Sequence, residues 1–157
     1  MEDTKFKMFC DYIDELQDIK KVPRLNRWQL EKLYLEYINT ECSDWIDIFS
    51  DDGKLIGFAI IGYYPNCHPD AEVYITEAYI IPEYRRQGYM HKTITQYIKN
   101  NHGTYCLFIV KNNDIALQFW QKVFADNGYE QIELADIGAA DDYCIQYGFA
   151  EVNRERI

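Results

Sequence analysis

The chain of 157 residues lacks the segments that would place it in a membrane or in a repeat architecture. No apolar run is long enough to cross a bilayer, and the opening residues MEDTKFKMFC do not have the layout of a signal peptide. The sequence contains no internal repeat and no linker rich in serine, glycine or proline. These absences predict a single domain over residues 1–157 in the cytoplasm, with no membrane partner.

Positive charge is also scarce. The chain has 16 Lys and Arg residues against 26 Asp and Glu residues, which gives a net charge of −10. That balance argues against sequence-independent binding to nucleic acids or to anionic membranes, because both need a cationic face. The five cysteines form no CxxC pair, and Cys67-His68 has no second pair at ligand spacing, so the sequence predicts no metal site.

The spacing of apolar residues predicts the secondary structure. A helix is expected over residues 5–20, and a second helix near Asn26, because Gln29 follows as in a capping box. Asp52-Gly53 is a strong hairpin signal between two apolar runs. The later predicted elements are strands over 72–81, 104–110, 129–135 and 143–149, and helices over 88–101 and 113–126.

This order of elements predicts an α/β fold, in which a central mixed sheet carries helices on both faces. The two β-α-β crossings are expected to be parallel or near-parallel and right-handed. The last two strands are expected to pair as an antiparallel hairpin at the edge of the sheet.

The junction between the strand over 72–81 and the following helix is the most informative stretch. It contains a basic island of Arg85, Arg86, His91 and Lys92, with no acid among them. The first N–H groups of a helix have no intrahelical partner and lie at the positive end of its dipole, and Gly88 lets the backbone approach an anion closely. The junction therefore predicts a site for a phosphorylated ligand; the alternative is a solvated loop with surface arginines.

Two motifs carry a resemblance to a known family. Arg85-Arg86-Gln87-Gly88-Tyr89-Met90, which follows a strand that ends at Pro82, resembles the acyl-CoA signature Arg/Gln-x-x-Gly-x-Gly/Ala of the GNAT superfamily of N-acetyltransferases. Met90 departs from the small residue of that signature. Asn113-Asp114-Ile115-Ala116 followed by Phe119-Trp120 is similar to a second family element. The strand that often opens the family is absent or displaced, since helical spacing begins by Phe6.

The resemblance implies acetyl-CoA as cosubstrate and an α/β GNAT-like fold. Backbone groups of the strand would pair with the pantetheine arm, the N–H groups of residues 86–91 would hold the pyrophosphate, and the thioester would lie in a splay between strands 72–81 and 104–110. The implied cofactor-binding residues are Ala78, Tyr79, Ile80, Arg85, Arg86, Gln87, Gly88, Tyr89, Met90, His91 and Asn113.

The implied reaction is direct acetyl transfer to an amine, which needs a general base and a proton for the leaving thiolate. Glu72 and Glu77 are the candidate bases, and strict strand alternation would place them on opposite faces. Of the two, Glu72 is preferred. Trp120 stands where the family has a tyrosine acid, and an indole cannot supply a proton near neutral pH. Tyr129, Tyr143 or Tyr147 could substitute, or the thiolate could leave unprotonated; Tyr147 is the candidate taken forward.

The acceptor is expected to be a small-molecule or peptide amine. Six acids and no Lys or Arg lie from Asp126 to Asp142, which suggests the hypothesis of a cationic acceptor, although an acidic stretch commonly serves solubility alone. Neutralising Asp141 and Asp142 would then raise the acceptor KM. Two other functions stay open at this point: a non-catalytic acyl-CoA-binding module and an interaction domain that binds no CoA. Exposed edge strands would also allow a homodimer.

Overall fold

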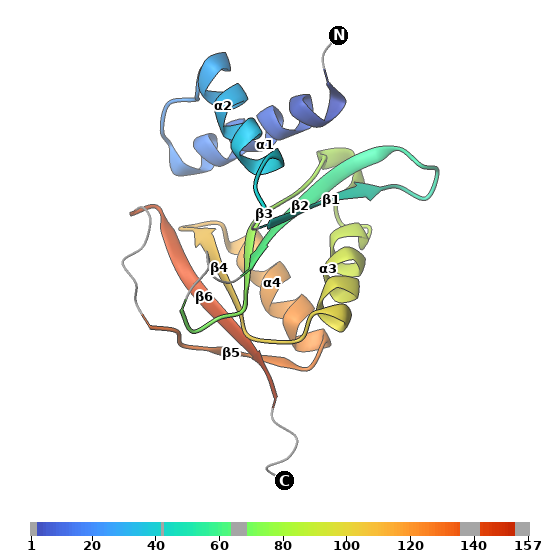
Figure 1. Cartoon of the computed structure of the whole chain (residues 1–157), viewed down its shortest axis with the longest axis vertical. Helices are drawn as coiled ribbons and strands as arrows, with labels where there is room; N and C mark the ends of the chain where they lie inside the picture. Colours follow the sequence, from blue (N-terminus) through green and yellow to red (C-terminus); the bar gives the residue numbers. More distant parts are fainter. Residues whose placement is uncertain (1–2, 42, 64–68, 136–141, 153–157) are drawn as a thin grey trace.

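The computed structural model describes residues 3–41, 43–63, 69–135 and 142–152 (Figure 1). The elements in chain order are α1 (Thr4–Lys20), α2 (Arg27–Ile38), β1 (Ser43–Phe49), β2 (Leu55–Tyr63), β3 (Val73–Ile80), a short 3-10 helix (Pro82–Tyr84), α3 (Tyr89–Asn100), β4 (Tyr105–Val110), α4 (Asp114–Asp126), β5 (Tyr129–Ile132) and β6 (Cys144–Glu151). Within the described residues, no strand precedes α1.

The six strands form one mixed sheet in the order β1-β2-β3-β4-β6-β5, which confirms the predicted fold class. β3 and β4 are parallel, and the other neighbouring pairs are antiparallel. The crossing through α3 therefore joins adjacent parallel strands, as expected. The crossing through α4 joins strands that are not neighbours, because β6 lies between β4 and β5, but these two strands also run parallel, since each is antiparallel to β6.

Local signals explain why the early elements form. The Asn26 side chain accepts from the backbone N–H of Gln29 at 2.9 Å, and the Gln29 side chain accepts from the Asn26 N–H at 2.9 Å. These two bonds are the predicted capping box, and they satisfy two donors at the start of α2. The Asp52-Gly53 turn joins β1 and β2 into an antiparallel hairpin, as the sequence predicts.

Two apolar cores cover the two faces of the sheet. α1 and α2 pack on one face, where Phe9 and Tyr34 meet Phe58 of β2. α3 and α4 pack on the other face through Ile94 and Phe124, among others. In Figure 1, α1 and α2 lie together at the top of the view, while α3 and α4 lie next to each other below.

β3 and β4 separate before they end. Their pairing covers only three registers, from Val73↔Tyr105 to Ile75↔Leu107, although β3 continues to Ile80 and β4 to Val110. The carboxyl-terminal halves of these central strands therefore diverge. We call the space between them the splay; it lies where the resemblance to the acetyltransferases implies a bound thioester.

A bulge in β3 changes which side chains face the helices. Ile60 pairs with Glu77 and Ile61 pairs with Ile75, so Thr76 is an extra residue in β3. Beyond the bulge, the alternation of side chains between the two faces of the sheet is shifted by one residue. Ala78 therefore joins the core under α3 and α4, while Tyr79 faces α1 and α2. Glu77 consequently points toward α1 and α2, where it meets two tyrosines.

Candidate active site

The predicted phosphate site is a loop that ends in an open helix start. Gly88 is the residue before α3, it has φ +86°, and no side chain caps the helix. The first α-helical hydrogen bond runs from the Lys92 N–H to the Gly88 carbonyl at 2.9 Å. The N–H groups before Lys92 in the first turn therefore have no acceptor within the helix. A Cβ built on Gly88 would meet no atom within 4 Å, which means that the space beside these amides is open.

Larger side chains of the loop turn toward the protein interior. Met90 packs against the core beneath α3, including the buried Ile80. Tyr89 packs against a small apolar cluster of Ile48, Ile56 and Ile80, and its hydroxyl accepts from the Asp51 N–H at 3.3 Å. The departure of Met90 from the small residue of the signature therefore reflects inward packing, and the Met90 backbone N–H keeps its place in the first turn of α3.

The basic island divides into two engaged side chains and two exposed ones. Arg85 donates to both carboxylate oxygens of Glu15 in α1, and His91 pairs with Asp126 at 2.9 Å. Hydrogen bonds from Lys122 and His91 hold the pKa of Asp126 below its ordinary value.

Arg86 and Lys92 are exposed, and neither makes an ion pair within the described part of the chain. They are therefore the cations that face solvent beside the loop. Gln87 is also exposed, and its side chain donates to the Glu83 carbonyl at 3.1 Å.

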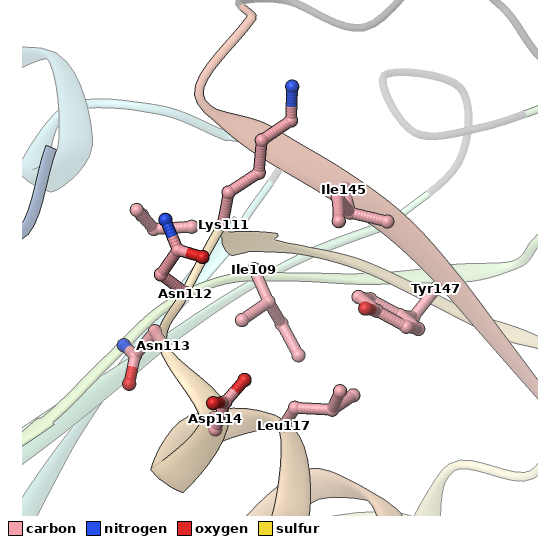
Figure 2. Close-up of a pocket in the computed structure, with 9 residues that line it drawn as sticks. Ile109, Lys111, Asn112, Asn113, Asp114, Leu117, Ile145 and Tyr147 are labelled. Carbon is pink, nitrogen blue, oxygen red and sulfur yellow. The ribbon is translucent and has the colours of Figure 1, made fainter.

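A cavity of about 360 Å³ lies at the end of β4, between α4 and β6. Figure 2 shows Ile109, Leu117 and Tyr147 around it and Asn113 at the start of α4. The side-chain oxygen of Asn113 accepts from the Ala116 N–H at 3.3 Å, which caps α4, and Asn113 also lines the cavity. Asn113 and Tyr147 thus line the same cavity, although they come from different parts of the chain.

On the opposite face, Glu77 binds two phenols. Tyr37 donates to one carboxylate oxygen at 2.8 Å, and Tyr12 donates to the other. Burial raises the pKa of Glu77, while the hydrogen bonds from Tyr12 and Tyr37 and the charge of Lys20 act to lower it. Burial and the nearby Glu77 also raise the pKa of both phenols well above the ordinary value, so Tyr12 and Tyr37 remain protonated donors at neutral pH.

Glu72 lies at the other end of β3. It is exposed, it precedes the strand, and its carboxylate accepts from the Thr104 N–H at 2.6 Å. Glu77 lies two residues beyond Ile75, the last residue of β3 that pairs with β4, and therefore beside the splay. The geometry favours Glu77 over Glu72 as the group that could accept a proton there. Alternation along β3 could not indicate this, because the bulge follows from pairing with β2.

The alternative proton donors are also separated by the fold. Tyr129 is buried beside Tyr105, toward the end of the sheet that carries Glu72. Tyr143 is 45% exposed and lies outside the cavity in Figure 2. Tyr147 lines that cavity. Trp120 is buried in the core against Phe124, so it is a packing residue in this fold.

Other predicted features have plain outcomes. Within the described residues, no three His, Cys, Asp or Glu side chains gather as metal ligands, and Cys67-His68 lies outside those residues.

None of the described helices is both long enough and apolar enough to span a bilayer. Residues 136–141 of the acidic stretch, including Asp141, also lie outside the described part.

Comparison with known proteins agrees with this geometry. The model of the acetyltransferase (GNAT) family matches residues 12–125. A spermidine N-acetyltransferase from Vibrio cholerae (F149A mutant) aligns over 99% of this chain and 96% of its own, with a TM-score of 0.61 and 15% identity. The same enzyme in complex with CoA and spermine aligns over 95% and 90%, with a TM-score of 0.61 and 15% identity.

An acetyltransferase from Thermus thermophilus aligns over 92% of this chain and 86% of its own, with a TM-score of 0.66 and 10% identity. No curated protein sequence gives a match. The structural likenesses establish the fold, and the family match covers well over half of the sequence. The chain belongs to the GNAT acetyltransferase family.

Proposed function

We propose that this protein transfers an acetyl group directly from acetyl-CoA to a primary amine. The observation that carries the proposal is the combination of an open helix start at Gly88 with a half-buried, tyrosine-bound Glu77 just beyond the last pair of β3 with β4. Family membership and this carboxylate favour an enzyme over a non-catalytic CoA-binding module.

Three neighbouring segments would bind acetyl-CoA: the start of α3, the end of β3 and the start of α4. The N–H groups at the start of α3 would bind the pyrophosphate, helped by the exposed cations Arg86 and Lys92. The edge of β3 beyond Ile75 is not paired with β4, so backbone groups near Ala78 would be open to the pantetheine arm. Asn113 would contact the arm from α4. When bound, acetyl-CoA supplies an activated thioester.

Glu77 and Tyr147 would handle the two protons. Glu77 accepts a proton from the acceptor ammonium group, directly or through water, and its raised pKa makes it a stronger base than an ordinary carboxylate. Tyr12 and Tyr37 hold the carboxylate in place from α1 and α2. Tyr147, on the cavity side, donates a proton to the departing thiolate.

Thermal unfolding with and without acetyl-CoA tests cofactor binding. Ligand at a hundred times Kd adds about 2.7 kcal/mol, which in a domain of this size corresponds to a rise in Tm of about 5–10 °C. Gly88→Asp should abolish the rise, because it places a negative side chain in the open space and strains a backbone at φ +86°. Gly88→Ala is the matched control for strain alone. No rise in the native protein would overturn the proposal.

Two further features are part of this proposal. The reaction is assigned to the cytoplasm on the sequence arguments above. A homodimer could form through β1, an edge strand on which Phe49 is 55% exposed. Light scattering at several protein concentrations would measure the oligomeric state.

A further inference from the structure

A second hollow, of about 180 Å³, lies at the end of β4 next to the last turn of α1. It shares Val110, Lys111 and Asn112 with the cavity in Figure 2, so the end of β4 and the turn after it form a wall of both. Ile109 belongs to the core under α3 and α4, and Val110 points to the opposite face by strand alternation. The second hollow is therefore on the face that carries α1 and Glu77.

Three lysines surround this hollow in a chain whose net charge is −10. Lys20 and Lys21 come from the end of α1, and Lys111 follows β4. Within the described residues, Asp142 is the one acid that lines it. Tyr143 connects the two segments: its ring lies 5.9 Å from the Lys20 ammonium, and its carbonyl accepts from the Lys111 N–H at 2.7 Å.

The hollow is linked to the proposed base by α1. Tyr12 of this helix donates to Glu77, and Lys20, eight residues later, lines the hollow. Eight residues correspond to about 12 Å along a helix, which is within the length of a small metabolite or a short peptide. The charge of Lys20 also acts on Glu77. An acceptor amine beside Glu77 could therefore place its other end among the lysines.

We propose that the acceptor is a primary amine that also carries a carboxylate or phosphate group, and that Lys20, Lys21 and Lys111 bind this anionic group. The inference rests on the proposed N-acetyltransferase function and names its substrate class. Ammonium groups attract carboxylates and phosphates and repel a second cation. A polyamine would therefore meet repulsion here, in contrast to the cationic acceptor that the acidic stretch suggests.

Matched amines test the proposal through release of the CoA thiol. The pairs are β-alanine with β-alaninamide and 2-aminoethyl phosphate with ethanolamine, and spermidine is the polycation. We expect kcat/KM for each anionic amine to exceed that of its neutral partner at least tenfold. Lys111→Gln should raise KM for the anionic amines about tenfold and spare the neutral ones, while Asp142→Asn should lower it. Preference for spermidine or the neutral amines would overturn the proposal.

A second readout needs no turnover. The experiment uses the Gly88→Asp variant, in which the loop before α3 should no longer bind phosphate. Inorganic phosphate should then slow the acetylation of Lys20, Lys21 and Lys111 by acetic anhydride. Peptide mass spectrometry measures the acetylation of each lysine. Lys99, exposed at the end of α3, is the control. Equal labelling of all four lysines with and without phosphate would overturn the anion site. Failure of acetyl-CoA to raise the Tm of the native protein would instead overturn the proposed function itself.

Discussion

Arg85 and Glu15 form a two-point ion pair that joins the phosphate loop to α1. The two guanidinium nitrogens lie 2.9 and 2.7 Å from the carboxylate oxygens, and the Arg85 Nε donates to the Ile80 carbonyl at 2.8 Å. The guanidinium also lies over the Tyr79 ring, 5.3 Å from its centroid. Arg85 therefore holds the end of β3 against the helix that carries Tyr12, while its neighbour Arg86 stays exposed.

Adjacent arginines should consequently give different phenotypes. Arg85→Ala should lower the free energy of unfolding by about 1 kcal/mol, since the pair is partly exposed, and lower Tm by about 2–4 °C. The Kd for acetyl-CoA should stay within about twofold. Arg86→Ala should leave Tm unchanged and raise that Kd about fivefold, which is about 1 kcal/mol. Calorimetric titration and thermal unfolding of both variants measure the difference; the reverse pattern would contradict it.

Removing the Glu77 carboxylate should slow the reaction. Glu77→Gln is expected to lower kcat at least about 100-fold, the usual scale for loss of a general base, with little change in acetyl-CoA affinity. Glu72→Gln, one residue before the same strand, is the matched control, and it should keep near-native kcat. Comparable losses in the two variants would remove the preference for Glu77.

The pH profile should report the raised pKa of Glu77. The base must be ionised to act, so kcat/KM is expected to fall as pH decreases through a pKa above the ordinary value of 4.5. The acceptor amine titrates as well. The ratio of native to Glu77→Gln activity, measured with one amine across the pH range, removes that contribution. A ratio that is constant with pH would show that Glu77 is not the titrating group.

The same shift predicts how stability depends on pH. Because the pKa of Glu77 is higher in the folded state, the folded protein binds this proton more tightly than the unfolded chain. The resulting stabilisation is fully present below the pKa that Glu77 has in the unfolded chain. It is lost as pH rises through the pKa that Glu77 has in the folded protein. Glu77→Gln lacks this loss. Urea unfolding should therefore show the native protein losing stability relative to the variant as pH rises above the unfolded value of about 4.

Tyr147 should affect the leaving group rather than binding. Tyr147→Phe keeps the ring that lines the cavity and removes the hydroxyl. We expect a drop in kcat of about 10-fold or more and an unchanged KM for acetyl-CoA. Tyr129→Phe, which lies outside that cavity, is the control. An unchanged kcat in Tyr147→Phe would favour departure of the unprotonated thiolate.

The sequence by itself determined the features that depend on neighbouring residues. The capping box at Asn26 and Gln29 and the turn at Asp52-Gly53 formed as predicted. The order of elements was also predictable, because hydrophobic periodicity reflects which local structure can bury an apolar face. The loop at Gly88 could be located for the same reason, since a helix start and a glycine are properties of one short segment.

The surroundings of that loop were decided only by the tertiary structure. Glu77 meets Tyr12 across 65 residues and Tyr37 across 40 residues, and Arg85 reaches Glu15 across 70 residues. The bulge that turns Glu77 toward these tyrosines depends on the register between β2 and β3. Side-chain patterns along one strand carry no information about such partners, because long-range packing sets both the register and the burial that raises the pKa of Glu77.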